Sequence, residues 1–354
     1  MTIFSSGVQQ SDEQQEITEW QRRGRLSTFG YLLPALIVMG ALTFYPLVYQ
    51  FYMSFMDYGI RSLNPSSAVY EAPEFVGLEN YQDIFDTGAS GVIQRELRQG
   101  SFNFWRVLSF NLFWTVTNVL IYSFIGVVVA IILNIKGLWL KTFYRGMYIL
   151  PVVIPTLVMA LVWVKLFDPE NGGVNYILGF LGGLIGRGDG SAANINWFGE
   201  GETLVVLFDF LPIPLAYIAM LSANVWLQWP FMTMVTTSAL QSVPDDLYEA
   251  AMMDGASYWQ QLTRITLPLI RSAVVPAAMI SAIWTFNSFE ISYFIRGGDF
   301  LYQTEILVTV AFRLINQAKM YGLASAFVVI IFIVLAILTF LTNMVTRASE
   351  RYDE

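Results

Sequence analysis

The sequence predicts an all-α integral membrane protein with about six transmembrane helices. The chain has 354 residues, of which 55% are hydrophobic and only 13% are charged, and its mean hydropathy is +0.54. Soluble domains carry about twice that charged fraction. The apolar residues gather in blocks of roughly 20 residues or more, the length that crosses a hydrocarbon core of about 30 Å. A lipid bilayer is therefore the first partner that the composition predicts.

Polar segments divide the apolar blocks into regions. The expected regions are a cytoplasmic N-terminal tail, a first transmembrane helix, an extracytoplasmic loop, a helical core and a cytoplasmic C-terminal tail, at residues 1–28, 29–56, 57–103, 104–346 and 347–354. The six expected spans are residues 29–55, 104–135, 146–167, 214–241, 273–295 and 321–346. The first span is expected to be retained, because residues 2–20 are acidic and glutamine-rich, unlike the basic start of a signal peptide.

Two apolar segments do not fit this series of spans. Residues 203–213 hold Asp209 and lead into prolines, which predicts either a bent lead-in to the fourth span or an interfacial helix. Residues 304–320 include Arg313 and Lys319. A full span there would place the C-terminus on the side opposite to the one that the basic residues indicate. We therefore expect an outer-face or partly re-entrant helix in this segment.

Lysine and arginine residues predict the orientation, because cytoplasmic loops carry an excess of them. With six spans, four basic groups fall on one side: Arg22, Arg23 and Arg25; Lys136, Lys141 and Arg145; Arg264 and Arg271; Arg347 and Arg351. The opposite loops carry mostly acids, among them Glu71, Glu74, Glu79, Asp83, Asp86, Asp168 and Glu170. Both termini and the polar segment at 242–272 are therefore expected in the cytoplasm.

The composition also excludes several functions. Cysteine and histidine are absent, which removes disulfides, thiolate and imidazole metal sites, and histidine acid–base catalysis. A membrane-embedded enzyme would have to rely on carboxylates, and these are poorly clustered. The formal charge of −8 argues against nucleic acid as a partner. No Gly-x4-Gly-Lys-Ser/Thr run occurs, so we expect no nucleotide or other cofactor bound by this chain and no catalytic residues in it.

The polar segment at 242–272, called the insert below, carries strong helix signals. Ser242 and Pro244, followed by two acids, predict a capped helix that runs to Met253. Gly255 can end it in a left-handed conformation. Ser257 and Gln260 resemble a capping box that opens a second helix, which Pro268 is expected to end. Read locally, the insert is either an interfacial unit that orients its neighbouring spans or a docking site for a cytoplasmic partner.

The same residues carry a family resemblance. The spacing Glu-Ala-Ala-x3-Gly-x9-Ile-x-Leu-Pro resembles the coupling motif of permease subunits in binding-protein-dependent ABC importers. Every position of the motif is present: Glu249, Ala250, Ala251, Gly255, Ile265, Leu267 and Pro268. The resemblance covers roughly residues 100–346.

Neighbouring motifs are similar to the MalF-type permeases of sugar importers. They are Trp226-x3-Pro230-Phe231, Leu240–Pro244, Asp254–Ser257, Phe286-Asn287, and Gly297-Gly298 followed by Thr304. The sequence departs from that pattern at Asp299, where the family usually has proline, and in extra length around 180–213.

The resemblance implies the type I permease fold of ABC importers, in a bacterial inner membrane. It implies that the insert docks in a cleft of a cytoplasmic ATPase through the motif residues and Asp254, with Glu249 as a charged contact and Ala250 and Ala251 allowing close approach. It also implies the partners: a second homologous permease, two ATPase subunits that bind ATP and Mg, and an extracytoplasmic substrate-binding protein. The substrate implied is a neutral sugar, oligosaccharide or glycoside.

Polar residues inside the spans are the candidates for substrate binding, because burying them without partners costs about 1–3 kcal/mol each. The second span places four such residues along one helical face, with Trp114 adjacent: Asn111, Thr115, Asn118 and Tyr122. The other candidates are Asn224, Gln228, Trp284, Asn287, Ser288 and Glu290. Helix–helix packing is the alternative role, since amides and hydroxyls also bond between helices in a bundle. Glu290 is expected to pair with Arg313 or Lys319, to contact substrate, or to stay wet near the outer mouth.

Other transport functions remain as alternatives. The chain could serve an ABC importer of another small solute, such as a polyol or glycerol phosphate. An ion-coupled secondary transporter is the remaining transport class, but the inverted repeats and charged midplane residues typical of that class are not evident in the sequence.

Overall fold

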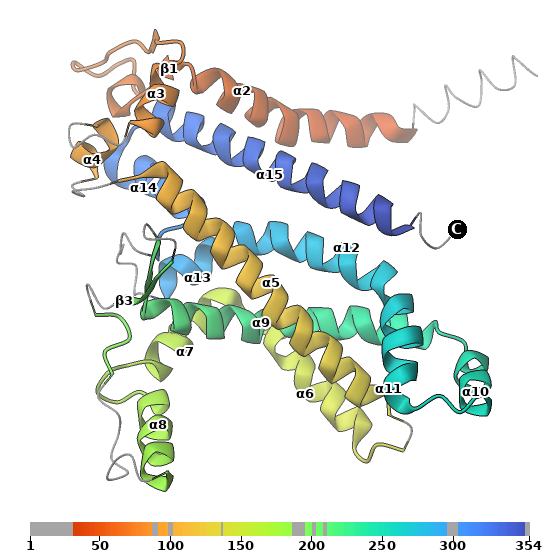
Figure 1. The fold of residues 1–354 in the computed structure, drawn as a ribbon. Coiled ribbons are helices and arrows are strands. Elements are labelled where there is room, and N and C mark those ends of the chain that lie inside the picture. Colours follow the sequence, from red (N-terminus) through yellow and green to blue (C-terminus); the bar gives the residue numbers. More distant parts are fainter. Residues whose placement is uncertain are drawn as a thin grey trace, which may run out of the picture.

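The computed structural model is a bundle of long helices that run in similar directions, with shorter elements gathered at the two ends of the bundle (Figure 1). The structure describes residues 31–86, 91–97, 102–135, 137–185, 195–199, 203–207, 211–295 and 304–350. The N-terminal tail, Lys136, the two glycines at 297–298 and Asp299 lie outside these residues. Within the described residues, strands form only two short antiparallel pairs, so the predicted all-α class is confirmed.

Four described helices are long and apolar enough to cross a membrane. They are Tyr31–Met53, which includes α2 (Tyr45–Met53), then α5 (Phe104–Asn134), Tyr258–Phe286, and Tyr321–Leu341 within α15 (Tyr321–Glu350). A bent helix pair makes a fifth span if it is counted as one. The fourth expected span, residues 214–241, corresponds to α9 (Ala216–Gln241), whose 26 residues rise about 39 Å. It falls short only in apolar character, because it carries buried polar residues such as Asn224 and Thr233.

The third expected span, residues 146–167, is not one straight helix. The structure has α6 (Lys141–Val153) and α7 (Thr156–Leu166), and their axes meet at 98°. Ile154 and Pro155 between them have extended backbones, with ψ angles of 129° and 134°. The residue before a proline is disfavoured in the helical region, so Pro155 explains the break.

The centre of the bundle is the crossing of α5 with α9 and with α12 (Leu267–Phe286). Figure 1 shows α5 running diagonally across the bundle past both helices. Gly126 allows α5 and α9 to approach closely: a Cβ atom there would lie 2.5 Å from the Met232 Cβ and 3.0 Å from the Met232 carbonyl carbon. The contact therefore needs a residue without a side chain.

The end of the bundle opposite to the C-terminus holds most of the short elements (Figure 1). They are β1 (Met56–Asp57) paired with β2 (Glu74–Phe75), η2 (Ile60–Ser62), α3 (Glu79–Phe85), α4 (Val92–Glu96), α8 (Gly173–Leu184) and α13 (Phe289–Phe294). The first loop is fastened to α15 at Gly322, whose N–H donates to the Tyr58 carbonyl at 2.8 Å. A Cβ at Gly322 would lie 2.0 Å from the Met56 carbonyl oxygen, so this contact also depends on glycine.

The turn between α7 and α8 is held by Asp168. The backbone N–H groups of Asn171 and Glu170 donate to its carboxylate at 2.9 and 3.1 Å. These two hydrogen bonds lower the pKa of Asp168. The chain therefore turns here within a few residues, and α8 begins at Gly173.

The expectation for residues 203–213 is wrong. The structure has a β-hairpin in place of a helical lead-in or an interfacial helix, with β3 (Thr203–Leu207) antiparallel to β4 (Leu211–Pro214). The run Thr203-Leu-Val-Val-Leu is rich in β-branched residues and therefore suits a strand as well as a helix.

The segment 304–320 contains no full span. It has α14 (Leu307–Arg313) followed by a π-helical turn, η5 (Leu314–Ala318), and together they are too short to cross a bilayer. Most of α14 is buried in one hydrophobic cluster with α5 and α15, in which Phe104, Leu307 and Phe327 take part. The expectation of a helix that does not span the bilayer is therefore confirmed, and its outer-face or partly re-entrant position stays a prediction.

We predict that Gly126→Ala lowers the melting temperature of the purified protein. The added methyl group overpacks the α5–α9 crossing, which typically costs about 1–3 kcal/mol. Gly146→Ala in α6 is the matched control, because a Cβ there meets nothing within 4 Å. Thermal unfolding followed by tryptophan fluorescence measures both variants. Equal melting temperatures for the two variants would contradict the close contact.

Candidate functional site

The first half of the insert forms the predicted short helix. It is α10 (Asp245–Met253), with Asp245 and Asp246 in its first turn. Gly255 ends it with φ +79°, and its N–H donates to the Met252 carbonyl at 3.0 Å. The Ala256 N–H donates to the Ala251 carbonyl at 2.9 Å, which completes a Schellman motif. The predicted glycine-terminated turn is confirmed.

The predicted serine cap at Ser242 is wrong. Pro244 is the N-cap residue of α10, and no side chain caps this helix. The Ser242 hydroxyl instead donates to the Ala239 carbonyl at 2.8 Å, because α9 ends only one residue earlier, at Gln241. The Ser242 side chain therefore bonds to the C-terminal end of α9, although the sequence pattern predicts that it caps the start of α10.

The second half of the insert begins as predicted and continues further. α11 (Tyr258–Gln261) opens with a capping box, in which the Gln260 side chain accepts from the Ser257 N–H at 2.7 Å. The expectation that Pro268 ends this helix is wrong. A π-helical turn, η3 (Leu262–Thr266), leads into α12, and Pro268 lies in the first turn of α12. There the Leu267 N–H donates to the Leu262 carbonyl five residues back, and this wider turn relieves the clash that a proline ring makes inside an α-helix.

The two halves of the insert are joined by side-chain contacts. The Tyr248 hydroxyl is 3.0 Å from the Thr266 hydroxyl, and the Gln261 amide donates to the Ala256 carbonyl at 3.1 Å. The insert leaves a cavity of about 240 Å³ against the ends of α5 and α9, where Asn134 and Leu240 line it. The insert is thus internally braced and only partly packed on the bundle.

The residues of the coupling motif lie mostly on the surface. Glu249, Ala250, Asp254, Gly255 and Pro268 are exposed, and Ala251 and Ile265 are half-buried. The Leu267 side chain is 39% exposed. Figure 1 shows α10 projecting from the end of the bundle at which the C-terminus lies. The motif therefore presents an accessible face to the surroundings.

Four large apolar residues that the sequence analysis missed surround this motif. They are Met252, Met253, Tyr258 and Trp259, between 58% and 89% exposed. Exposed apolar residues that cluster in a polar segment are typical of an interaction surface. Their position directly beside Gly255 is the signal in the sequence that could have identified them.

The polar residues of α5 make hydrogen bonds inside the bundle. The Asn111 amide donates to the Phe286 carbonyl at 3.1 Å and accepts from the Leu307 N–H at 2.9 Å. The Trp114 indole donates to the Thr285 carbonyl at 3.2 Å and to the Ser288 hydroxyl at 3.0 Å. All four groups that bond to Asn111 and Trp114 belong to α12, α14 or the segment after α12. These contacts favour the packing role over substrate binding for the first part of the face.

The rest of that face has partners as well. Asn118 accepts from the Asn224 amide of α9 at 2.7 Å and donates to the Trp114 carbonyl. The Thr115 hydroxyl donates to the Asn111 carbonyl at 2.8 Å, and the Tyr122 hydroxyl is 3.3 Å from that of Thr285. All six of these candidates are buried. Asn111, Trp114, Asn118, Tyr122 and Asn224 form a hydrogen-bonded seam between helices, whereas Thr115 bonds only within α5.

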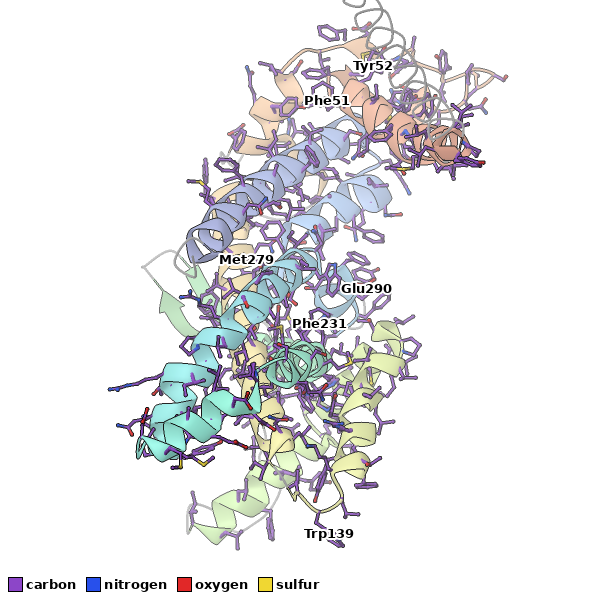
Figure 2. The ribbon with its side chains drawn as sticks, turned by 90° about the vertical axis from the view of Figure 1, so that its right-hand side faces the viewer. Phe51, Tyr52, Trp139, Phe231, Met279 and Glu290 are labelled. Atoms are coloured by element: carbon purple, nitrogen blue, oxygen red, sulfur yellow. The ribbon has the colours of Figure 1, made fainter. Side chains whose placement is uncertain are left out.

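The remaining substrate candidates lie closer to the surface. Trp284 is 52% exposed, and its ring centre is 5.5 Å from that of Phe231 on α9. Gln228 and Asn287 are half-buried, and the Asn287 amide donates to the Ile283 carbonyl at 3.2 Å. Glu290 is exposed in the first turn of α13, which agrees with the expectation that it stays wet. Figure 2 shows Phe231 and Glu290 near the middle of the molecule.

An aromatic cluster missed by the sequence analysis adjoins Glu290. The ring centres of Phe289 and Tyr293 are 5.0 Å apart, and Phe312 lies 4.7 Å from Phe289 and 5.2 Å from Tyr293. Together with Trp284 and Phe231 these rings provide flat apolar surfaces beside polar groups. A sugar needs both kinds of contact, since its hydroxyls take hydrogen bonds and its ring faces stack.

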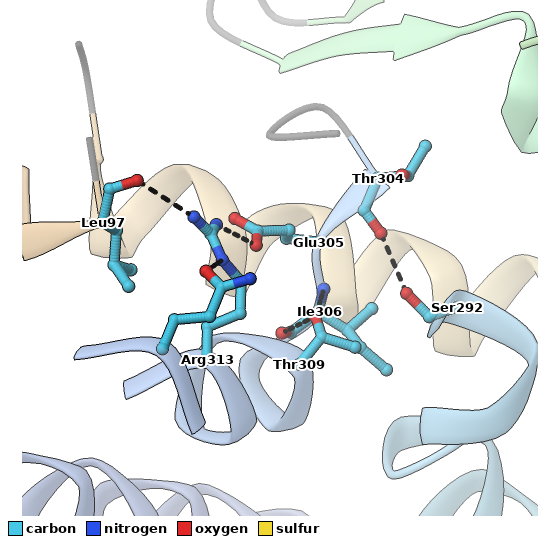
Figure 3. Close-up of polar contacts among 8 residues, drawn as sticks. Leu97, Ser292, Thr304, Glu305, Ile306, Thr309 and Arg313 are labelled. Atoms are coloured by element: carbon cyan, nitrogen blue, oxygen red, sulfur yellow. Dashed lines mark hydrogen bonds and ion pairs between the residues drawn. The ribbon is translucent and has the colours of Figure 1, made fainter. Parts of the chain in front are cut away.

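A buried ion pair near the same end was also missed. Arg313 donates to the Glu305 carboxylate at 2.5 Å and to the Leu97 carbonyl at 3.3 Å (Figure 3). Burial raises the pKa of the Glu305 carboxyl, and the Arg313 guanidinium opposes that shift. Arg313 thus links the loop at Leu97 to α14. Its ion-pair partner is Glu305 and not Glu290, the partner that the sequence analysis considered.

Comparisons with known proteins identify the architecture. A family model described as "binding-protein-dependent transport system inner membrane component" matches residues 123–352. The chain is similar to the galactooligosaccharides transport system permease protein GanP of Bacillus subtilis, at 28% identity over 93% of this chain and 73% of the relative. It is also similar to the trehalose/maltose transport system permease protein MalF of Thermococcus litoralis, at 28% identity over 91% of this chain and 95% of the relative.

A solved structure agrees with the predicted fold. A chain of a bacterial ABC transporter involved in the import of the acidic polysaccharide alginate matches with a TM-score of 0.69 at 18% identity, over 94% of this chain and 99% of that chain. This similarity confirms the predicted type I permease fold of ABC importers.

We predict that Asn118→Ala and Asn224→Ala each destabilise the protein and that their effects are not additive. A hydrogen bond between membrane helices contributes about 0.5–1.5 kcal/mol, so the two variants should be coupled by that amount. A double-mutant cycle of thermal unfolding measures the coupling. Gln228→Ala, one turn further along α9, is the control, because within the described residues its side chain makes no hydrogen bond. Additive effects of Asn118→Ala and Asn224→Ala would contradict the seam.

Proposed function

This chain belongs to the family of binding-protein-dependent transport system inner membrane components, and from that premise we propose that it is the permease subunit of an ATP-driven importer for a neutral sugar, oligosaccharide or glycoside. Members of this family are transport subunits and not enzymes. The single observation that carries the proposal is the insert, a braced helical unit whose coupling motif is accessible at one end of the bundle.

The insert would dock on a cytoplasmic ATPase subunit. Ala250 and Ala251 give α10 a narrow face, Glu249 offers a charge to a basic residue of the ATPase, and the exposed Met253 and Trp259 add apolar contact area. ATP and Mg would be bound by that partner, because this sequence has no phosphate-binding motif of its own. The complete importer would hold two such ATPases and a second homologous permease.

The connection to the bundle suits a mechanical role. The second half of the insert passes through η3 into α12 without a loop, and α12 packs on α5 and α9. A displacement of the insert would therefore move the polar and aromatic residues around Trp284 with it. ATP binding would draw the inserts of the two permeases together and open the substrate cavity between the permeases to the outside. ATP hydrolysis would return the transporter to its starting state.

The orientation follows from charge. The insert, which holds Arg264, lies at the same end of the bundle as the C-terminus, and α6, which begins at Lys141, lies beside α11 of the insert, whereas α3, which holds Asp83, lies at the other end (Figure 1). We assign the first end to the cytoplasm of a bacterial cell and the second to the outside. The outer end would receive substrate from a binding protein. In support, a similar alginate transporter, matched at a TM-score of 0.68 and 19% identity, has a crystal structure in complex with an alginate pentasaccharide-bound periplasmic protein.

The substrate would contact the candidates that the seam leaves available. Trp284, Phe231 and Tyr293 offer ring faces, and Gln228 and Glu290 offer polar groups. The similarity to permeases named for galactooligosaccharides and for trehalose and maltose favours a sugar over a polyol or glycerol phosphate. Membership of the family sets aside an ion-coupled transporter.

We predict that Gly255→Pro and Ala251→Phe uncouple ATP hydrolysis from uptake while the chain still inserts in the membrane. Proline cannot adopt φ +79° and has no N–H to donate to Met252, and a phenyl ring at 251 holds the ATPase away from α10. Sugar uptake, ATPase rate and copurification of the ATPase measure the effect.

The matched control for these variants is Gly137→Ala compared with Gly255→Ala. Both glycines have left-handed φ, +85° and +79°, with no atom within 4 Å of a Cβ, so both substitutions impose similar backbone strain. Only the change at 255 should lower uptake. Wild-type transport by Gly255→Pro and Ala251→Phe would disprove the docking role of the insert.

We predict that Trp284→Ala raises the KM for sugar uptake by about two- to tenfold, because an aromatic contact contributes about 0.5–1.5 kcal/mol. Radiolabelled sugar uptake in proteoliposomes measures it, and ATPase stimulation by binding protein loaded with different sugars identifies the substrate. Trp139→Ala is the control, since Trp139 is 80% exposed and lies at one end of the molecule, away from Phe231, whose ring packs against Trp284 (Figure 2). An unchanged KM in Trp284→Ala would remove this residue from the site.

A further inference from the structure

An apolar groove of about 520 Å³ lies on the surface of the bundle between α5, α6 and α9. Ile132 and Leu133 of α5 form one wall, and Met147 of α6 forms the other. The side chains of Ile132 and Met147 are 48% and 50% exposed, so the groove opens outward rather than into the core. Its volume falls in the range of ordinary ligand sites, about 300–1,000 Å³.

Three aromatic residues with polar tips also line the groove. Tyr144, Tyr148 and Trp229 contribute rings to it, and the centres of the Tyr148 and Trp229 rings are 6.1 Å apart. Within the described residues, neither tyrosine hydroxyl nor the Trp229 indole N–H makes a hydrogen bond. Such rings, apolar in body and polar at one tip, are enriched where hydrocarbon meets the headgroup region of a bilayer.

Two cations of α6 neighbour the aromatic residues of the lining. Lys141 precedes Tyr144 by three residues, and Arg145 precedes Tyr148 by three, so each shares a face of α6 with a ring of the lining. Neither cation forms an ion pair within the part of the chain that the structure describes. Both belong to the first two turns of α6, which begins without a side-chain cap after Leu140. The free N–H groups of that end add to the positive potential.

We propose that this groove binds an anionic phospholipid. One acyl chain lies against Ile132, Leu133 and Met147, and the phosphate lies at Lys141 and Arg145, within reach of the Tyr144 hydroxyl. Charge complementarity decides the class of occupant, because two cations beside an apolar groove match an anionic headgroup joined to its acyl chain. The proposal requires only that the chain lie in a membrane, and it is independent of the transported solute.

The position of the groove gives the bound lipid a structural consequence. Its walls come from α5 and α6, and Trp229 belongs to α9 next to Pro230. The lipid would therefore fill the groove between α5, α6 and α9, on the α6 side of the 98° break between α6 and α7. A protein surface that covers the groove, such as the second permease, is the competing occupant that the experiment must distinguish.

The absence of cysteine makes the test direct. Met147→Cys creates a single labelling site on this chain, and a fluorophore attached there reports on brominated lipids within contact distance. The full chain is reconstituted in phosphatidylcholine vesicles that contain small amounts of brominated phosphatidylglycerol or brominated phosphatidylcholine. We expect phosphatidylglycerol to quench at a lower mole fraction, by about fivefold for each cation and about 30-fold for both, since a basic residue near an anionic surface contributes about 1 kcal/mol.

The variant that tests the proposal is Lys141→Gln with Arg145→Gln, which should abolish the preference for phosphatidylglycerol. Lys165→Gln with Arg264→Gln is the matched control, because it removes the same charge outside the groove and should leave the preference intact. Equal quenching by the two lipids, or a preference that survives the loss of Lys141 and Arg145, would overturn the proposal. No quenching by either lipid would mean that protein covers the groove, which also overturns it. Mass spectrometry of retained phosphatidylglycerol on the unlabelled chain checks the result without the fluorophore.

Discussion

Two helix ends lie buried inside this bundle, and the need to satisfy their backbone groups is the constraint on which the rest of the architecture depends. α12 ends at Phe286 and α14 begins at Leu307, so carbonyl and N–H groups lose their helical partners there. Asn111 bonds to both ends, and Trp114 bonds to the carbonyl of Thr285. An unpaired backbone group in hydrocarbon costs several kcal/mol. The polar face of α5 therefore makes broken helices possible at the end of the bundle opposite to the insert.

The hydrogen bonds of α5 also separate a buried, bonded part of the bundle from the exposed substrate candidates beside it. The seam joins α5 to α9, α12 and α14, while the exposed Trp284 and Glu290 stand just outside it. The insert is braced internally by Tyr248 and Thr266 and continues directly into α12. Force applied at the insert would thus reach the neighbourhood of Trp284 through a continuous helix, without crossing a flexible loop.

The sequence predicts most of the helices and the turn of the insert, because their signals are local. Gly255 and the Ser257 capping box are examples, and the structure confirms both. The sequence predictions fail where a residue far along the chain, or a competing hydrogen-bond partner, determines the local structure. The π-helical turn accommodates Pro268, and the end of α9 takes the hydroxyl of Ser242. The amides of α5 suit a substrate and a helix end equally well, and only the position of Phe286 distinguishes the two roles.

Because the partners of Asn111 lie far along the chain, they are synthesised well after it. The Phe286 and Leu307 backbone groups follow Asn111 by 175 and 196 residues. A ribosome that adds about 5–20 residues per second makes them roughly 10–40 s later. Throughout that interval α5 must be held with its amides beside water, lipid headgroups or the insertion machinery. The span that organises the finished bundle is therefore made well before the backbone groups that it will satisfy.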